Sequence, residues 1–224
     1  MGKGKEMKDR IDLHTHTFFS DGELSPSELA NRAGKLGHEL VAITDHVGPS
    51  NFESVLEKVK VASNELTKSF DVDVIPGVEI THVPPELIPE LAEKSVDQGA
   101  EVVVVHGETV VEPVPEGTNL KGIECDDVDI LAHPGNMSSE EAELAADTGT
   151  FLEISGRDGH SYSNGRVVKL SLEVGADLVV NTDAHCPGQL MSYEKAEEIA
   201  LGAGLPEEMV EEVLEENPRK VLEG

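Results

Sequence analysis

The sequence predicts an α/β barrel built from seven strand–helix units. Three observations favour this fold: seven short apolar runs, a helical pattern after most of them, and a length of 224 residues, which suits such a barrel. Near-continuous apolar strands are typical of a parallel sheet whose two faces are both covered. A doubly wound open sheet is the competing architecture, and periodicity alone does not separate the two.

The predicted strands are short runs rich in Val, Ile and Leu, separated by turn residues. They cover residues 10–14, 41–44, 72–80, 101–106, 129–133, 150–155 and 176–182. A strand and a helix that recur about seven times are the organisation of an α/β barrel.

The segments between these strands carry helix signals. Ser25, Pro26 and Glu28 form an N-terminal capping pattern, and Gly37 stops the same helix. Further helices are predicted over residues 51–70, 84–99, 138–149, 165–175 and 192–204, most of them with a terminal Gly. The tail, 205–222, is predicted to be a last helix that Pro218 breaks.

The chain shows no internal boundary. No Ser/Gly linker, low-complexity tract or sequence repeat divides it. We therefore expect one domain over residues 1–224, in which the motifs described below span 12–185 and C-terminal helices cover 192–222.

The charge balance limits the partners of the protein. Seventeen basic and 45 acidic residues give a net charge of −28. Nucleic acid and anionic membranes are bound mainly through Lys and Arg, so we expect neither as a partner. An anionic substrate would need a local positive centre, which metal ions can supply.

Cysteine usage and hydropathy indicate the compartment. Cys125 and Cys186 are too few and too far apart for a disulfide scaffold. The first ten residues are charged and lead into no signal-type apolar segment, and no run approaches the ~20 apolar residues of a membrane span. We expect a cytoplasmic protein that spans no membrane.

Histidines recur where the predicted strands end. His14 and His16 follow the first strand, and residues two apart on a strand point the same way. The other strand-end residues of this kind are His46, Glu79, His106, His133, Asp183 and His185, and Asp21 follows closely on the first strand. The C-terminal rim of a barrel is where functional groups gather, and imidazole with carboxylate suits zinc, manganese or iron. One such His is more often a core or capping residue, so the repetition carries the prediction.

Six motifs together resemble a known family. "HTHTFFSDG", "AITDH", "PGVE", "VVVVH", "ILAHPG" and "NTDAH" are similar to the ordered motifs of the PHP superfamily, which includes polymerase-associated domains and histidinol phosphatases. The match spans Asp12 to about His185. The resemblance implies a distorted, TIM-like (βα)7 barrel and a phosphoesterase with two or three divalent ions (Zn, Mn or Fe).

The resemblance also implies ligand sets. One ion would be held by His14, His16, Glu79 and Asp183. A second would be held by Glu79, His106 and His133, and a third by Asp21, His46 and His185. Some members of the family have His where this chain has Asp21. A hydroxide held by the ions, with Glu79 and Asp183 around it, would attack phosphorus.

Substrate contacts are expected from the loops of the same rim. Arg157 resembles an arginine of some histidinol phosphatases and offers a donor fork to phosphate. His160 and His82 are further candidates, and an ordinary loop position is the alternative for all three. Asp45 either orients an imidazole or makes a turn, and the long connection 107–128 is either a lid or an ordinary excursion.

The leading hypothesis is hydrolysis of a small phosphorylated metabolite, a phosphomonoester, by a histidinol-phosphatase-like enzyme. An amidohydrolase-type enzyme is an alternative, because that class also places His-x-His on the first barrel strand. A non-catalytic, metal-stabilised subunit that binds a partner is the other alternative. The sequence selects neither the native substrate nor an oligomeric state.

Overall fold

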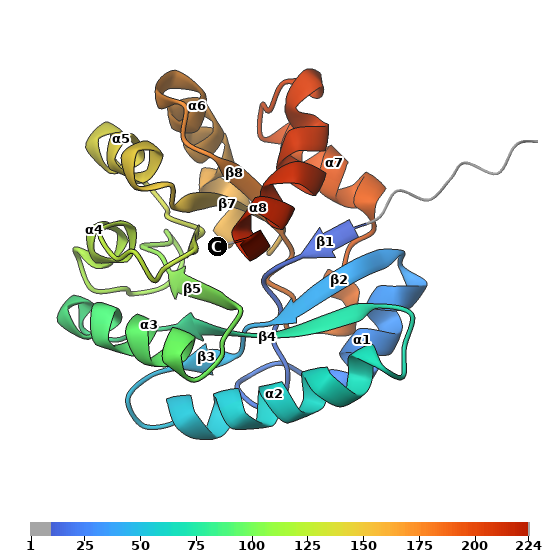
Figure 1. Ribbon diagram of the computed structural model, residues 1–224. Helices are drawn as coiled ribbons and strands as arrows, with labels where there is room; N and C mark the ends of the chain where they lie inside the picture. The colour runs from blue at the N-terminus through green and yellow to red at the C-terminus, as the bar shows by residue number, and fades with distance from the viewer. Residues whose placement is uncertain (1–9, 224) are drawn as a thin grey trace, which may run out of the picture.

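The computed structural model describes residues 10–223, whose strands form a parallel sheet nearly closed into a barrel (Figure 1). The strands are β1 (Arg10–Asp12), β2 (His38–Ile43), β3 (His46–Val47), β4 (Asp73–Ile80), β5 (Val102–His106), β6 (Ile130–Ala132), β7 (Phe151–Ser155) and β8 (Leu178–Asn181). Their hydrogen-bonded order is β1-β2-β4-β5-β6-β7-β8, and β3 pairs with β4 beside this path. The predicted seven-stranded barrel is therefore confirmed, with the two-residue β3 as an addition that the sequence analysis missed.

Helices surround the sheet on its outer face, except α8, which lies across one end of the barrel (Figure 1). They are α1 (Pro26–Lys35), α2 (Phe52–Thr67), α3 (Ile88–Asp97), α4 (Thr118–Ile123), α5 (Ser139–Thr148), α6 (Asn164–Val174), α7 (Tyr193–Gly202) and α8 (Asn217–Glu223). The predicted cap of α1 is present, because the Ser25 side chain accepts a hydrogen bond from the Glu28 N–H. Gly149 and Gly175 end α5 and α6 in the left-handed conformation that glycine adopts without strain. No helix within residues 10–223 is both long and apolar enough to cross a lipid bilayer.

One helical expectation was wrong, and one short helix was not predicted. Pro218 does not break the last helix, because a π-helical stretch, η5 (Glu212–Glu216), leads directly into α8. The Asn217 N–H donates to the Glu212 carbonyl, which is the wider hydrogen-bond spacing of a π-helix. The helix then continues through Pro218, which has no N–H to donate. In addition, residues 118–123 of the long connection form α4, which is too short to show a helical period in the sequence.

The strands alternate between an inner and an outer core. On β5, Val102 and Val104 belong to the cluster inside the barrel, whereas Val103 and Val105 pack outward under the helices. The inner cluster also contains Val221 of α8, which lies across the end of the barrel where the strands begin. Apolar side chains therefore fill this end, and the polar side chains gather at the opposite one.

Side chains complete the junction between β1 and β8. The backbone contributes one bridge between Thr15 and Ala184. Arg10 donates to the Val180 carbonyl at 2.7 Å, and an Asp12 carboxylate oxygen accepts the Thr182 N–H at 3.1 Å. Asn181 accepts the Leu13 N–H at 2.9 Å, and the Asp183 N–H donates to the His14 carbonyl at 2.9 Å. These bonds satisfy buried polar groups and bring the loops after the first and last strands together.

We expect the carboxyl group of Asp129 to make the free energy of unfolding depend on pH. Burial raises its pKa to about 6, although the carboxylate accepts the Val103 N–H at 2.7 Å. A raised pKa in the folded state means that the folded protein loses stability as the pH rises from about 4 to about 6. We expect Asp129→Asn to keep the hydrogen bond and remove this loss, a gain of up to about 3 kcal/mol above pH 6.

The measurement is the free energy of unfolding of both proteins by urea between pH 4 and pH 8. A constant difference between parent and variant over this range would contradict the prediction.

Candidate metal centre

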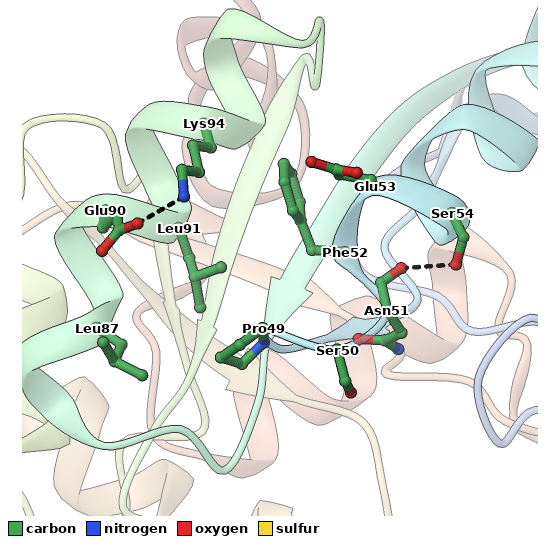
Figure 2. Close-up of a pocket in the computed structure, with 10 residues that line it drawn as sticks. All are labelled: Pro49, Ser50, Asn51, Phe52, Glu53, Ser54, Leu87, Glu90, Leu91 and Lys94. Atoms are coloured by element: carbon green, nitrogen blue, oxygen red, sulfur yellow. Dashed lines mark hydrogen bonds and ion pairs between the residues drawn. The ribbon is translucent and has the colours of Figure 1, made fainter.

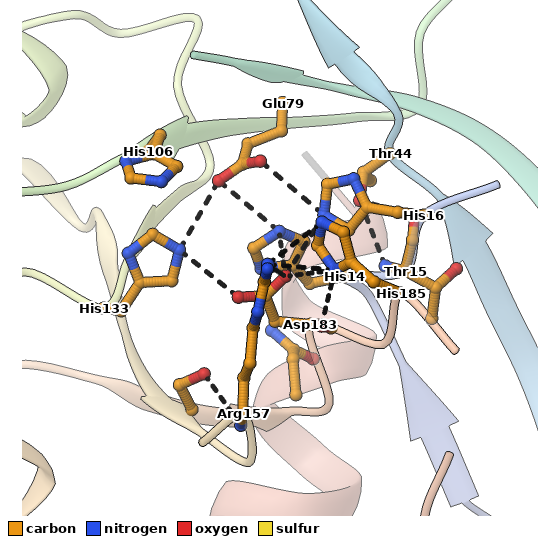
Figure 3. Close-up of polar contacts among 12 residues, drawn as sticks. His14, Thr15, His16, Thr44, Glu79, His106, His133, Arg157, Asp183 and His185 are labelled. Carbon is orange, nitrogen blue, oxygen red and sulfur yellow. Dashed lines mark hydrogen bonds and ion pairs between the residues drawn. The ribbon is translucent and has the colours of Figure 1, made fainter. Parts of the chain in front are cut away.

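All nine residues expected to bind metal lie in one cluster at the ends of the strands. Their ligand atoms form groups that share members, and within each group all ligand atoms lie within 4.8 Å of one another. The groups are His14 with His16 and Asp183; His14 with Glu79 and His133; His16 with Asp21, His46 and His185; His106 with His133 and His160; and His82 with His106 and Glu112. Figure 3 shows most of these side chains facing one another. The expectation that strand ends gather them at one rim agrees with this geometry.

The strand ends differ in detail from the prediction. β1 ends at Asp12, so His14 and His16 lie just beyond it rather than on it. Their backbone stays extended enough for the intervening Thr15 to bridge to Ala184. The two rings lie 5.0 Å apart, and both reach the cluster.

The first set consists of His14, His16, Glu79 and Asp183. The Nε2 atom of His14 lies 3.5 Å from Oε1 of Glu79 and 3.7 Å from Oδ1 of Asp183. The Nε2 atom of His16 lies 3.6 Å from Oε2 of Glu79 and 3.3 Å from Oδ1 of Asp183. Two ligand atoms on one ion, at bonds of about 2.1 Å, lie roughly 3.0 to 3.4 Å apart. The set therefore has nearly the spacing that a shared ion requires.

Buried atoms without hydrogen-bond partners show that these residues fit a cation. They are Nε2 of His14, both ring nitrogens of His16 and of His133, Oε1 of Glu79 and Oδ2 of Asp183. Buried polar atoms are nearly always hydrogen-bonded. A cluster of buried imidazole and carboxylate atoms without hydrogen-bond partners therefore indicates a ligand. A divalent cation satisfies imidazole nitrogen and carboxylate oxygen together.

The third set lies nearer to solvent. Oδ1 of Asp21 is 3.3 Å from Nε2 of His46 and 3.1 Å from Nε2 of His185, and these two nitrogens are 3.4 Å apart. Burial raises the pKa of Asp21, but the contacts with His185 and His46 outweigh it and hold the pKa well below its usual range. The carboxylate is therefore charged and available to a cation.

The second set departs from the expected partners. Nε2 of His133 lies 3.5 Å from Oε1 of Glu79, as expected, whereas the carboxylate in contact with His106 is Glu112. His160, expected to contact substrate, lies inside the cluster, its ring 4.1 Å from that of His133. Burial and the neighbouring His106 lower the pKa of His133 to about 4, and burial and His133 lower that of His160 to about 4. Both rings are therefore neutral at pH 7 and keep a free lone pair.

Glu153 on β7 holds His14 in place, and the sequence analysis missed it. Its carboxylate is fully buried, and Oε2 lies 2.7 Å from Nδ1 of His14. Asn181 donates to the same oxygen at 3.2 Å. This contact fixes the ring so that Nε2 faces the cluster, as carboxylates commonly do for metal-binding imidazoles. The available signal was a charged residue in the middle of an apolar strand.

Asp45 organises the loop after β1. Its carboxylate accepts bonds from the N–H groups of Thr17 and Ser20, at 2.8 and 3.1 Å, and from both hydroxyl groups, at 2.6 Å each. The structure therefore supports the turn-forming alternative. The loop that carries Asp21 owes its shape to this carboxylate.

Arg157 and His82, both expected to contact substrate, reach the cluster from two loops. Nη1 of Arg157 lies 3.2 Å from Oδ1 of Asp183 and 3.0 Å from Nε2 of His185 (Figure 3). Nε2 of His82 lies 3.2 Å from Oε2 of Glu112. A cavity of about 500 Å³ adjoins the cluster, and its lining includes Asp21, His46, Asn51, His82, Glu112 and Arg157.

Glu112 is the functional candidate that the sequence analysis did not single out. It lies in the first half of the long connection, residues 107–117, which extends to the cluster, whereas α4 packs against the sheet. Its carboxylate contacts His82, His106 and His160 at 3.2, 3.2 and 3.3 Å. The hydrogen bond with His106 holds the pKa of Glu112 well below its usual range, although burial raises it. Nothing in the sequence pattern separates this residue from the other glutamates of the loop.

Strained backbone marks the same region. Within residues 10–223, the non-glycine residues with positive φ are His82, His133 and Asp183, at 53°, 31° and 51°. Such conformations cost roughly 1 to 3 kcal/mol each and occur preferentially at functional sites. All three residues belong to the cluster or contact it.

A second pocket lies away from the histidines. It has a volume of about 350 Å³, lies between α2 and α3, and is lined by residues that include Phe52, Glu53, Leu91 and Lys94 (Figure 2). Its cation, Lys94, is 2.5 Å from the Glu90 carboxylate. The lining contains no histidine, so this pocket offers none of the chemistry of the cluster.

The comparisons with known proteins identify the family. Residues 12–155 match the model of the PHP domain, and the chain belongs to this family. An uncharacterized protein of Methanocaldococcus jannaschii is 49% identical over 95% of this chain and 98% of its own length. A probable phosphatase of a Thermoanaerobacter species is 28% identical over 96% of this chain and 98% of its own length.

The family resemblance inferred from the motifs is thus confirmed. A DNA polymerase/3'-5' exonuclease of Bacillus subtilis is also similar, at 29% identity over 78% of this chain, but this chain covers 34% of its length. Among solved structures, the ochratoxinase of A. niger has a TM-score of 0.61 at 11% identity, covering 96% of this chain and 71% of that one. At this identity the likeness concerns the fold alone, and it agrees with a TIM-like barrel.

Glu153→Gln tests the role of the buried carboxylate. The amide keeps the shape of the side chain but binds the His14 ring more weakly, so we expect the affinity for divalent metal to fall by roughly 10- to 100-fold. The measurement is competition with a chromophoric chelator for Zn²⁺. Glu143→Gln, which removes the same charge from an exposed position on α5, is the control. Equal affinities for the two variants would contradict this role.

Proposed function

We propose that this protein is a metal-dependent phosphoesterase that hydrolyses a small phosphomonoester. The observation that supports it most strongly is the set of buried, unpartnered imidazole and carboxylate atoms that share one space. Membership of the PHP family and the relatives named probable phosphatases support the same reaction. Histidinol phosphate is one member of the substrate class, and the size of the cavity suits a small metabolite.

Divalent zinc, manganese or iron would be held by the nine ligands at the ends of the strands. When bound, these ions supply positive charge that offsets the repulsion between a phosphate dianion and its nucleophile. Glu79 contacts both His14 and His133 and would serve two ions, as the family resemblance implies. Asp183 contacts both His14 and His16 and would hold the first ion. The ions also explain how a chain of charge −28 would admit an anion.

The residues of the chain have separate roles in this proposal. Arg157 lines the cavity and touches the cluster, so its planar guanidinium would bind phosphate oxygens through two parallel N–H bonds. His160 would complete the phosphate side of the pocket, and His82 lines the same cavity. Glu153 and Asn181 would keep the His14 ring oriented throughout the reaction.

The alternatives are less consistent with these side chains. The middle strands of the barrel, β4, β5 and β6, contain no lysine that could bridge two ions as in an amidohydrolase. A binding subunit would not need an arginine next to a complete ligand set. The similarity to the ochratoxinase therefore stays a similarity of fold.

We also propose a cytoplasmic location. Cys125 and Cys186 are both free, and Cys125 is buried. Unpaired cysteines are usual in a reducing compartment.

Hydrolysis of p-nitrophenyl phosphate tests the proposed reaction. We expect turnover by the protein as purified with metal, loss of turnover after chelation, and recovery on addition of Mn²⁺ or Zn²⁺. The assay follows p-nitrophenolate absorbance, with an anilide substrate in parallel. A fully metallated sample that cleaves no phosphoester would favour the binding subunit, and cleavage of the anilide would favour the amidohydrolase.

Arg157→Lys tests the phosphate contact. Lysine keeps the charge but loses the planar fork, so we expect KM for the phosphoester to rise about tenfold or more while metal content stays the same. Steady-state kinetics together with elemental analysis measure both quantities. An unchanged KM would remove Arg157 from the substrate site.

A further inference from the structure

The loop 107–117 presents Glu112 to the cluster in a fixed position. At its base, Glu108 accepts the N–H groups of Gly117 and Asn119 at 2.9 and 3.1 Å, and Asn119 donates to the Pro134 carbonyl at 2.9 Å. Further along, Val111 packs so closely on Gly159 that an added Cβ there would lie 3.2 Å from it. Contacts at the base of the loop and next to Glu112 therefore hold this part of the loop beside the cluster.

The spacing of its contacts equals that of the metal-ligand sets. Oε2 of Glu112 lies 3.2 Å from Nε2 of His106 and 3.2 Å from Nε2 of His82. These separations fall in the range of roughly 3.0 to 3.4 Å for two ligands on one ion. They match the 3.1 and 3.3 Å contacts of Asp21 in the third set.

His82 and His106 present their Nε2 atoms to the same carboxylate for independent reasons. The other ring nitrogen of His106, Nδ1, lies 3.2 Å from the Gly107 carbonyl, so Nε2 is left for a ligand. His82 has a positive φ of 53°, a strained conformation that it shares with two residues of the cluster. Its side chain is 43% exposed and still contacts the Glu112 carboxylate at 3.2 Å.

We propose that Glu112 and His82 bind the same divalent ion as His106. These three residues form a rim metal site, to which Glu112 and His82 contribute ligands beyond the nine that the family resemblance implies. The inference rests on the proposed function, because His106 belongs to the metal cluster. His106 Nε2 can bind one ion, so the rim site adds ligands to an ion rather than adding an ion. Its loop would hold that ion from the solvent side.

The test compares metal retention without any substrate. Parent, Glu112→Gln and His82→Asn proteins are stripped, reloaded with Zn²⁺ and titrated with a competing chelator. We expect both variants to lose one ion at a chelator concentration at least about tenfold lower than the parent, while the other ions are retained equally. Glu116→Gln, an exposed charge removal on the same loop, should match the parent. Circular dichroism melts of the stripped proteins should coincide, which separates ligand loss from misfolding.

Retention of every ion by Glu112→Gln, as in the parent, overturns the rim site. The affinity for inorganic phosphate gives a second readout. If Glu112 only occupied the place of a phosphate, Glu112→Gln would bind phosphate more tightly and retain its ions as the parent does. That result also overturns the rim site. A parent that retains no ion overturns the rim site and the proposed function together. A parent that binds metal and cleaves phosphoester while the variants retain all ions overturns the rim site alone.

Discussion

Closure of the barrel between β1 and β8 is the interaction on which the rest of the structure depends. One backbone bridge, between Thr15 and Ala184, joins the chain just beyond the two strands, and side chains of Arg10, Asp12 and Asn181 add further bonds. These bonds bring residues from opposite ends of the chain within reach of one another, so that His14 meets Asp183. Asn181 serves both purposes, because it bonds to the junction and to the carboxylate behind His14.

The second constraint is electrostatic. The deep imidazoles and carboxylates of the cluster, among them His14, His16, Glu79 and Asp183, are buried. Burying such groups without partners is costly, and the strained conformations of His133 and Asp183 add to that cost. The fold tolerates this arrangement because stability comes from the outer core between strands and helices, which is large and continuous. The candidate metal ligands thus lie at the ends of the strands, whereas the outer core lies along their outer face.

Much of this organisation was predictable from sequence because strands and caps are local signals. The apolar runs gave the strands to within a few residues, and the recurrence of His at their ends located the rim. Features that depend on tertiary contact were not predictable: Glu112 has no distinguishing pattern, and β3 exists only because His46 pairs with Glu79. The π turn before Pro218 and the short α4 likewise arise from packing rather than from periodicity.

The position of α8 has a practical consequence. Its Val221 completes the inner core, and Asn217 donates to the Leu178 carbonyl at the start of β8. Helix α8 is therefore the floor of the barrel, at the end opposite the histidines. Removing α8 would expose the apolar side chains of the inner core to water.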